Sequence, residues 1–366
     1  MIKERKSQFF TEQIMLWHHT LNKREMPWKG EKDPYKIWLS EIILQQTRVE
    51  QGTSYYLRFI EKFPTVQKLA LASDDAVFKL WEGLGYYSRC KNLLASARQI
   101  AFEEGGSFPQ NYNAILKMKG VGPYTAAAIA SFAYNFPHAV ADGNVLRALA
   151  RFYGVKIPID SNEGKIFFSA LAQSLLDQNA PAVYNQAIMD FGAGICKPKL
   201  PLCNECILQT KCEAYKKDIV ALLPIKANKL IKKKRSFYFI IAEFDNKIYV
   251  RKRTEKDIWQ NLWEFILFET DGRSNSEAFF QSALFQKTVG EKFNVDYISA
   301  PFKQQLTHQT IEGVFVHIRL AGPLLNENFT AVNKKELAKL AFPRMVTNFF
   351  ESGGLERIGR DKFSWK

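Results

Sequence analysis

Long apolar runs are absent from this chain of 366 residues. A membrane-spanning helix needs about 18 or more consecutive apolar residues, and no stretch reaches that length. The opening residues, Met-Ile-Lys-Glu-Arg-Lys-Ser, also lack the apolar core of a secretory signal. We therefore expect a soluble, cytoplasmic protein with no membrane partner.

Acidic residues and cysteines are scarce. Asp and Glu number 37 against 51 Lys and Arg, which gives a formal net charge of +14. This excess favours a polyanionic partner, nucleic acid rather than a membrane, although lysine-rich surfaces also occur for solubility alone. Four of the five cysteines lie between residues 196 and 212, and a reducing compartment argues against disulfide bonds. Cys90 stands apart and is expected to be a buried structural thiol.

The first part of the chain reads as a series of helices. From about residue 8 to 222, apolar residues recur at spacings of three and four, and Gly, Pro, Asn or Asp occupy the breaks. The expected helices are Phe9–Leu21, Ile37–Gln51, Thr53–Phe63, Asp75–Trp81, Asn92–Glu103, Pro123–Tyr134, Val145–Tyr153, Ile166–Leu176 and Ala182–Phe191. We assign residues 1–222 to an all-α domain.

The second part of the chain differs in composition and in the spacing of its apolar residues. Residues 223–235 are rich in lysine and poor in apolar residues, which is typical of a basic interdomain linker. Residues 236–366 are expected to form an α+β domain. Its expected strands are Phe237–Phe244, Lys247–Lys252 and Val314–Leu320, with helices at Ser276–Lys287, Lys334–Leu340 and Pro343–Glu351.

A Gly-Val-Gly turn joins a short helical run, Asn113–Lys117, to the helix Pro123–Tyr134. This is a helix–hairpin–helix pattern over residues 113–134. Gly120 and Gly122 can both adopt positive φ and leave their backbone N–H groups exposed. Exposed amides at a helix N-terminus form a site for a phosphate. The alternative is an ordinary hairpin between two helices, and Gly-Val-Gly alone favours that alternative.

One carboxylate lies in the strongly apolar helix that begins at Ile37. Helical spacing places Glu41 on one face with Trp38, Ile42 and Gln45. If this face lines a cavity, desolvation raises the pKa of Glu41 and keeps it protonated near neutral pH. The alternative places Glu41 on the solvent side of a core helix.

A second carboxylate, Asp142, precedes the helix that starts near Val145. The dipole of that helix favours an anion, so we expect Asp142 to be ionised, although it could be a simple helix cap. A protonated glutamate and an ionised aspartate are the pair used to cleave glycosidic bonds. One donates a proton to the leaving group, and the other stabilises the positive charge that develops on the sugar.

Four cysteines form a C-x6-C-x2-C-x5-C pattern: Cys196, Cys203, Cys206 and Cys212. Four thiolates within 17 residues indicate a metal site. Structural zinc is usually bound by two short Cys pairs, and only Cys203 and Cys206 form such a pair. The spacing therefore favours a [4Fe–4S] cluster over zinc. The lysines between the ligands also favour a basic loop held against phosphate.

These features together resemble the endonuclease III superfamily of DNA glycosylases. Within it, Trp38-Leu-Ser-Glu41-Ile-Ile-Leu-Gln-Gln-Thr47, Gly83-Leu-Gly-Tyr-Tyr-Ser-Arg89 and Asp142-Gly-Asn144-Val look like the adenine glycosylase branch, the MutY type. The resemblance covers about residues 15–215. It implies an adenine-specific enzyme of base excision repair that removes adenine mispaired with 8-oxoguanine or guanine from duplex DNA. It also implies a monomer associated with the nucleoid.

The resemblance also implies roles for individual residues. Glu41 would protonate adenine N7, and Asp142 would stabilise the oxocarbenium ion. The other implied positions are Tyr124 and Asn144 in the catalytic pocket, Arg24 and Gln186 around adenine, Gln46 and Tyr86 as wedges in the base stack, and Thr47 and Leu84 near 8-oxoguanine. Inserted side chains fit the physics, because a base must leave the duplex to be attacked. Tyr86 and Leu84 could instead be core residues, and Gln46 a surface amide.

Tyr124 bears on the type of reaction. Superfamily members that also cut the DNA strand carry a lysine in the position that Tyr124 resembles. A phenol cannot form a Schiff base, which requires an amine. We therefore expect a monofunctional glycosylase.

The C-terminal part resembles the Nudix-like domain of MutY proteins. The resemblance rests on Asp257-Ile-Trp-Gln-Asn-Leu-Trp-Glu-Phe265 and Leu306-Thr-His-Gln309. The Nudix catalytic box is absent, which argues against pyrophosphate hydrolysis. The family reads 8-oxoguanine with a Phe-Ser-His loop, and this chain has Leu306-Thr307-His308, so the phenyl ring is lost while a hydroxyl remains. His308 could also be an ordinary histidine at a strand end.

Two other functions stay open on the sequence alone. One is an endonuclease III-like lyase for oxidised pyrimidines, which Tyr124 and the Nudix-like part disfavour. The other is a DNA-binding module without catalysis, which the presence of both Glu41 and Asp142 disfavours.

Overall fold

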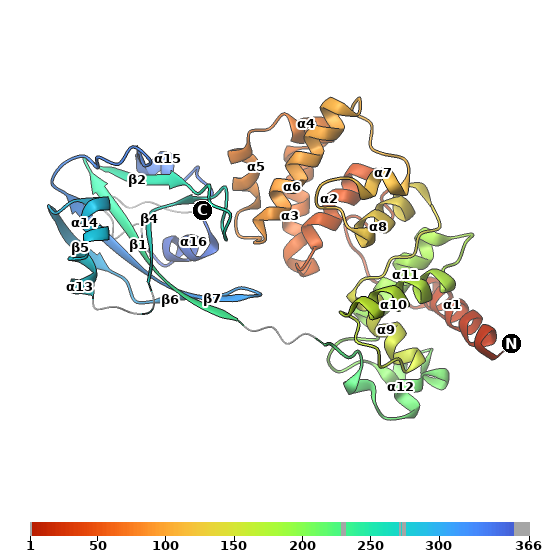
Figure 1. Ribbon diagram of the computed structural model, residues 1–366. Helices are drawn as coiled ribbons and strands as arrows, with labels where there is room; N and C mark the ends of the chain where they lie inside the picture. The colour runs from red at the N-terminus through yellow and green to blue at the C-terminus, as the bar shows by residue number, and fades with distance from the viewer. Residues whose placement is uncertain (1, 228–231, 271, 273–275, 355–366) are drawn as a thin grey trace. The chain divides into compact units, whose positions relative to one another are not determined.

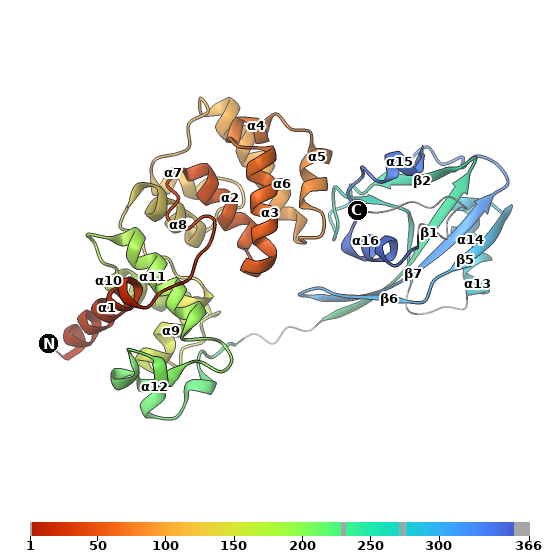
Figure 2. The same ribbon diagram turned by 180° about the vertical axis from the view of Figure 1, so that it is seen from behind.

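The computed structural model describes residues 2–227, 232–270, 272 and 276–354. The chain divides into two compact units. The helical unit is Met1–Leu71 with Asn92–Lys229, and the sheet unit is Ala72–Lys91 with Leu230–Lys366. Each unit is seen from two opposite sides in Figures 1 and 2. Within the described ranges, no helix is both long enough and apolar enough to cross a membrane.

The helical unit confirms the all-α expectation for the first part of the chain. Its helices are α1 (Ile2–Thr20), α2 (Pro34–Leu44), α3 (Val49–Lys62), α4 (Val66–Ala70), α6 (Tyr87–Arg98, shared with the sheet unit), the π-turn η1 (Gln99–Glu103), α7 (Tyr112–Leu116), α8 (Pro123–Tyr134), α9 (Gly143–Tyr153), α10 (Asn162–Leu175), α11 (Pro181–Gly194) and α12 (Glu213–Lys216), with short 3-10 turns at η2 (Cys203–Glu205), η3 (Gln209–Lys211) and η4 (Val220–Leu222). One core packs α1, α9, α10 and α11 together around Phe10, Phe152, Phe168 and Phe191.

The prediction of a single helix over Ile37–Gln51 is wrong. Helix α2 ends at Leu44, and Gln46 adopts a left-handed φ of 58° before α3 begins at Val49. The run Gln45–Arg48 is polar, so it offers no apolar side chain that would keep a continuing helix packed on the core.

The helix–hairpin–helix is present with one correction. Asn111 caps α7, and Gly120 takes a φ of 79° in the turn before α8. A Cβ on Gly120 would lie 2.8 Å from the Asn92 Cβ atom, so both conformation and space require glycine there. Gly122, however, is not left-handed, because it is the extended N-cap of α8 with a φ of −95°.

The sheet unit confirms the expected mixture of helix and strand. Its described strands are β1 (Lys233–Phe244), β2 (Lys247–Lys252), β3 (Trp263–Glu264), β4 (Ile266–Thr270), β5 (Phe293–Ile298), β6 (Phe302–Gln305), β7 (Gln309–Leu320) and β8 (Thr330–Val332), and its helices are α5 (Asp74–Trp81), α13 (Ser276–Phe280), α14 (Ala283–Val289), α15 (Lys334–Leu337) and α16 (Arg344–Glu351). The sheet runs in the order β3-β2-β1-β7-β5, and β1 and β7 pair in parallel. The expected helix Ser276–Lys287 is in fact two helices, because Ser282 caps a new helix by accepting a hydrogen bond from the Phe285 amide.

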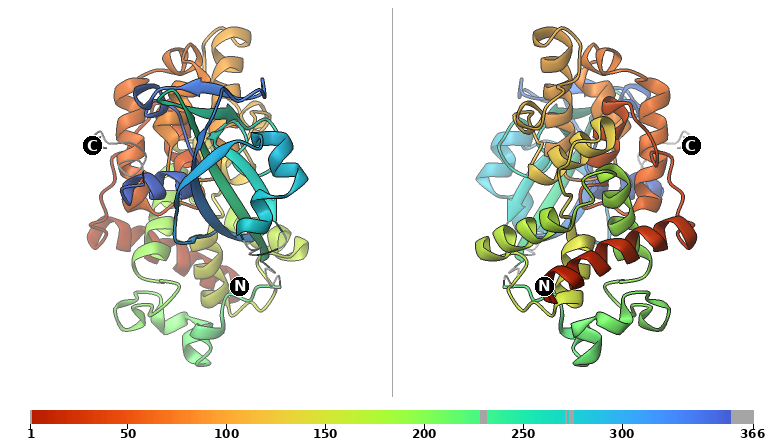
Figure 3. Two further views of the ribbon diagram at one scale, coloured as in Figure 1. Left: turned by 90° about the vertical axis from the view of Figure 1, so that its left-hand side faces the viewer. Right: turned by 90° about the vertical axis from the view of Figure 1, so that its right-hand side faces the viewer.

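Helices cover both faces of this sheet, as the side view in Figure 3 shows. On one face the Tyr238 and Phe279 rings stack with centroids 4.3 Å apart, which packs β1 against α13. On the other face Phe315 stacks on Phe349 of α16 at 4.1 Å. Strand β1 begins at Lys233, so the last three residues of the expected linker are strand, while residues 228–231 lie outside the described part.

Candidate active site

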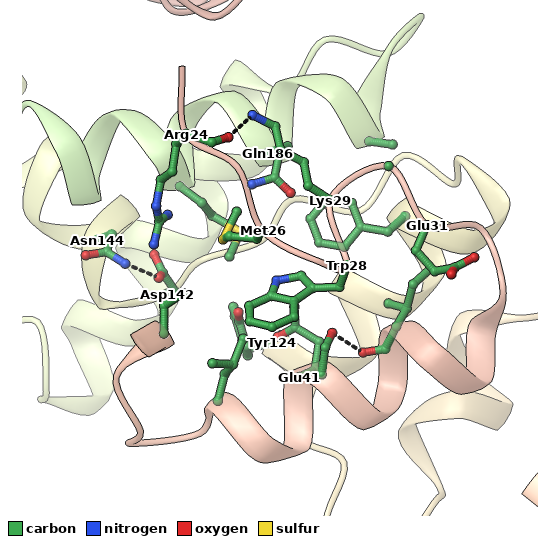
Figure 4. Close-up of a pocket in the computed structure, with 18 of the residues that line it drawn as sticks. Arg24, Met26, Trp28, Lys29, Glu31, Glu41, Tyr124, Asp142, Asn144 and Gln186 are labelled. Carbon is green, nitrogen blue, oxygen red and sulfur yellow. Dashed lines mark hydrogen bonds between the residues drawn. The ribbon is translucent and has the colours of Figure 1, made fainter. Parts of the chain in front are cut away.

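A cavity of about 640 Å³ lies in the helical unit between α2, α8, α9, α11 and the irregular segment after α1. Figure 4 shows the side chains that point into it. Eight residues that the sequence singled out line this cavity: Arg24, Glu41, Gln46, Thr47, Tyr124, Asp142, Asn144 and Gln186. They come from separate segments of the chain, so the fold brings them together.

Glu41 is only 7% exposed in this cavity. Asp33 begins its helix by accepting a hydrogen bond from the Tyr35 amide, and Pro34 occupies the first turn. Burial raises the pKa of Glu41 to about 7, a hydrogen bond from Tyr124 opposes the rise, and the charge of Asp142 adds to it. Glu41 therefore keeps its proton up to neutral pH, as the sequence predicted for a cavity-facing position.

The cavity-facing side of α2 differs from the expected one. Ile37, Ser40 and Leu44 line the cavity with Glu41. Gln45, which was expected on the same face as Glu41, does line the cavity, whereas Trp38 and Ile42 from that face are buried in the core and are not part of the lining.

Asp142 is the N-cap of α9 and also faces the cavity. One carboxylate oxygen accepts the Val145 amide at 2.7 Å, and the other accepts the Asn144 side-chain amide at 2.7 Å. Burial nevertheless raises the pKa of Asp142, although these hydrogen bonds and Arg147 oppose the rise. The expected place of Asp142 at a helix N-terminus is confirmed, but the net shift of its pKa is upward, because desolvation outweighs the donors. That Asp142 is ionised stays a prediction.

Tyr124 occupies the first turn of α8, directly after Gly122 and Pro123. Burial and the two nearby carboxylates raise the pKa of its phenol well above the ordinary value. The phenol is therefore neutral and available as a donor to Glu41. Two lysines contribute amines to the cavity lining, Lys29 and Lys32, and Lys32 is exposed.

Arg147 connects Asp142 to the cysteine-rich loop. Its guanidinium donates to the Asn144 side-chain oxygen at 2.9 Å, to the Gly192 carbonyl at 2.7 Å and to the Cys196 carbonyl at 2.7 Å. Because Asn144 donates to Asp142, one chain of hydrogen bonds runs from the loop to the cavity. This arginine was not singled out from the sequence.

The four cysteines Cys196, Cys203, Cys206 and Cys212 lie in the segment between α11 and α12. Burial raises the pKa of Cys206 to about 12, and the other three thiols add to the rise. Arg151 holds the loop by donating to the carbonyls of Lys197 at 2.7 Å and Leu223 at 3.0 Å. Among the described residues, no three His, Cys, Asp or Glu side chains are arranged to hold a single metal ion. The fifth cysteine, Cys90, is fully buried, which confirms the expected structural thiol.

One wall of the cavity was missed by sequence reasoning. The segment between α1 and α2 contributes Met26, Trp28, Lys29 and Glu31 in addition to Arg24. It has no regular secondary structure and is fastened to α11 by Asp190, which is fully buried. Asp190 accepts Arg24 at 2.8 Å and Asn22 at 2.9 Å, and Lys29 lies 3.5 Å away. An irregular segment rich in charged residues between two helices was the available signal.

The remaining predicted residues lie outside this cavity lining. Gly120 and Gly122 are in the hairpin of the helical unit. Leu84 and Tyr86 belong to the sheet unit, where Leu84 is buried and Tyr86 is 42% exposed. Thr307 and His308 form the turn between β6 and β7 of that same unit, and His308 is exposed.

The helical unit combines a glycine hairpin with a cavity that holds a buried acid, Glu41, and a helix-capping carboxylate, Asp142. This combination defines a helix–hairpin–helix glycosylase. Comparison with known families agrees: residues 39–165 match the family described as HhH-GPD superfamily base excision DNA repair protein, and residues 237–352 match the NUDIX domain. A solved thermostable thymine-DNA glycosylase has 29% sequence identity and a TM-score of 0.55, covering 59% of this chain and 100% of that one.

Comparison with individual proteins indicates which kind of glycosylase this chain resembles. The adenine DNA glycosylase of Buchnera aphidicola subsp. Schizaphis graminum is 37% identical over 263 residues, which is 71% of this chain and 75% of that protein. The adenine DNA glycosylase of Buchnera aphidicola subsp. Baizongia pistaciae is 34% identical over 324 residues, 88% of this chain and 90% of the relative. The chain belongs to the MutY-type adenine DNA glycosylase family.

Proposed function

We propose that this protein is a monofunctional N-glycosylase that excises adenine mispaired with 8-oxoguanine or guanine from duplex DNA. The observation that carries the proposal is the pairing of Glu41 and Asp142 in one cavity, with the pKa of Glu41 raised to about 7. Adenine is a poor leaving group as an anion, so a proton donor must neutralise it as the bond to the sugar breaks. Glu41 supplies that proton, to N7 of the flipped adenine.

Asp142 acts on the sugar side of the bond. Its carboxylate stabilises the oxocarbenium ion, as the second carboxylate does in glycoside hydrolysis. The Val145 amide and the Asn144 side chain orient it, because each donates to a different oxygen. Arg24 and Gln186 bind adenine, and the exposed amides of the hairpin at Gly120 and Gly122 hold a DNA phosphate.

The opposite base is read by other residues. Gln46 and Tyr86 wedge into the base stack, Thr47 and Leu84 lie near 8-oxoguanine, and Thr307 and His308 contact it from the Nudix-like domain. The left-handed φ of both Gln46 and Tyr86 supports these assignments, because bulky residues in this conformation cluster at functional sites.

A base-release assay tests the substrate. Duplexes that contain A:8-oxoguanine, A:G or thymine glycol are incubated with the protein, and free base is measured. Release of adenine from the first two and nothing from the third is the expected result. Release from thymine glycol would favour a lyase for oxidised pyrimidines, and no release from any duplex would leave only a binding module.

Tyr124 supports the monofunctional assignment, because it occupies the position where strand-cutting relatives carry an amine. Borohydride traps the Schiff base that a lyase forms with DNA. We expect no stoichiometric adduct that depends on base release. Trapping of such an adduct would show a lyase step and would contradict the assignment.

We propose further that Cys196, Cys203, Cys206 and Cys212 hold a [4Fe–4S] cluster, which anchors the basic loop. The spacing of the four cysteines within one loop supports this proposal, and so does the influence of the other three thiols on the pKa of Cys206, which indicates that the four are near one another. Iron and acid-labile sulfide of roughly four each per chain, with broad visible absorption, are expected. Zinc without sulfide would contradict the cluster.

A further inference from the structure

The segment 72–91 is bound to the Nudix-like domain at several separate points. It contains helix α5 and the loop Gly83–Arg89, and it forms one compact unit with residues 230–366. Within this unit, Asp75 accepts the Lys252 ammonium at 2.7 Å, and Lys91 reaches the Gln260 side chain at 3.5 Å. Contacts therefore occur near both ends of the segment.

The firmest contact lies at the end of α5. One oxygen of Glu82 accepts the Phe342 backbone amide at 2.7 Å, and the other pairs with Lys79 at 2.6 Å. Lys79 in turn donates to the Leu340 carbonyl at 2.9 Å. Phe342 is fully buried and stacks on Phe265, so Glu82 is attached to a fixed part of the domain.

The loop that follows Glu82 carries Tyr86. Its backbone has a φ of 48°, which is unfavourable for a bulky residue and persists only where neighbouring structure fixes it. Gly83 and Gly85, which precede Tyr86, are also left-handed, and the Trp81 indole donates to the Gly85 carbonyl at 3.0 Å. The Tyr86 hydroxyl lies within hydrogen-bond distance of the Thr307 hydroxyl, in the β6–β7 turn.

We propose that Glu82 and Lys79 are positioning residues for recognition of the base opposite adenine. They hold the loop Gly83–Arg89 against the Nudix-like domain, so that Tyr86 and Thr307 meet 8-oxoguanine as one preformed surface. This inference rests on the proposed function, because it concerns how the same enzyme distinguishes 8-oxoguanine from guanine. Neither residue lines the adenine cavity.

Single-turnover excision from A:8-oxoguanine and A:G duplexes tests the inference. Glu82→Ala removes the acceptor for the Phe342 amide and the partner of Lys79. We expect the ratio of the two rates to fall by about tenfold or more, which corresponds to about 1.4 kcal/mol of discrimination. The A:G rate should stay within about twofold, because the adenine cavity belongs to the other unit. Hydrogen exchange at residues 83–91 should rise in parallel.

Two variants separate positioning from loss of folding. Glu82→Gln keeps an acceptor for the Phe342 amide while it loses the charge, so it should fold normally and show an intermediate ratio. Glu351→Gln is the matched control, because Glu351 forms an exposed ion pair with Arg344 at 3.0 Å in the same unit. Its ratio should equal that of the wild type.

The outcomes distinguish this inference from the proposed function. A wild-type protein that releases no adenine would overturn the proposed function and the inference with it. A wild type that releases adenine at equal rates from both duplexes would leave the proposed function standing and would overturn the inference alone. A wild type with the preference, and a folded Glu82→Ala with an unchanged ratio, would overturn the inference alone. An equal fall of both rates would indicate general destabilisation and would also overturn it.

Discussion

Glu41 is a carboxylic acid at a position where the carboxylate form is unfavourable. Folding raises its pKa from 4.5 to about 7, chiefly by removing water. A group whose folded pKa is raised stabilises the protein fully below its unfolded pKa and loses that contribution as the pH rises through the folded pKa. The same burial that raises the pKa of Glu41 therefore makes the fold less stable in alkali.

Replacing Glu41 by glutamine should remove this loss of folding stability at high pH. The amide has no charge to bury. The stability of Glu41→Gln minus that of the wild type should therefore be larger at pH 8 than at pH 5, by about 2 kcal/mol. Denaturant unfolding at the two pH values measures the difference. An identical stability difference at both pH values would mean that Glu41 is not held protonated by the fold.

Tyr124 should set the pH at which activity declines. Its hydrogen bond to Glu41 lowers the pKa of that carboxyl, so Tyr124→Phe should raise the pKa further. Because the protonated acid is the active form, the wild-type excision rate should fall as the pH rises through about 7, and the variant's decline should occur at higher pH. The pH profile of single-turnover excision measures both.

Tyr35→Phe provides the control for that profile. Tyr35 is also buried, but its hydroxyl donates to the Phe63 carbonyl at 2.6 Å and not to Glu41. Its profile should match that of the wild type. A decline at unchanged or lower pH in Tyr124→Phe would contradict the role of the hydrogen bond.

At the residue scale, sequence motifs predicted the cavity residues to which we assign catalytic roles but missed those that hold them in place. Glu41, Asp142, Tyr124 and Asn144 belong to short local patterns. Asp190 contacts Arg24 across 166 positions of sequence, and Arg147 reaches the Cys196 carbonyl across 49. Such partners depend on how helices pack, and no local pattern records that packing.

At the scale of elements, α9 and α11 approach each other closely at Gly192. A Cβ atom on Gly192 would lie 2.8 Å from both the Cβ and the carbonyl oxygen of Asn144, in the first turn of α9. That turn carries Asp142 and Asn144 into the cavity. The small residue in α11 therefore sets the position of Asp142, the proposed catalytic carboxylate.

Gly192→Ala should push this turn away from α11. Displacement of a catalytic group by a fraction of an ångström to 1 Å lowers rates steeply, so we expect excision to fall on the order of 10- to 100-fold. Gly194→Ala is the matched control, since a Cβ there meets nothing within 4 Å. Equal activity of the two variants, measured as adenine release at saturating enzyme, would argue against the close approach.

Helices were easier to predict than strands. The 3.6-residue period located most helices of the first unit, and β2 was predicted with its observed bounds, Lys247–Lys252. Strands β3, β4, β5, β6 and β8 were not predicted. Most of them are short, and β5 is largely exposed, so it lacks the alternation of buried and exposed residues that marks a strand.

At the scale of the whole molecule, the domain boundaries 1–222, 223–235 and 236–366 stay a prediction. The compact units do not follow them, because residues 72–91 group with the C-terminal part of the chain. The predicted boundaries mark where the amino-acid composition changes along the chain. Composition does not record that Glu82 contacts Phe342 some 260 positions away.

The central features of the proposed mechanism are the role of Asp142 and base removal without strand cutting. The direct measurement is single-turnover incubation with an A:8-oxoguanine duplex, in which free adenine is quantified together with strand breaks before and after alkali. Wild type and Asp33→Asn, in which the altered residue also caps a helix but lies outside the cavity lining, should release adenine and give breaks only after alkali. Asp142→Asn should release none while it still binds the duplex. Full release by Asp142→Asn, or strand breaks before alkali in the wild type, would contradict the account.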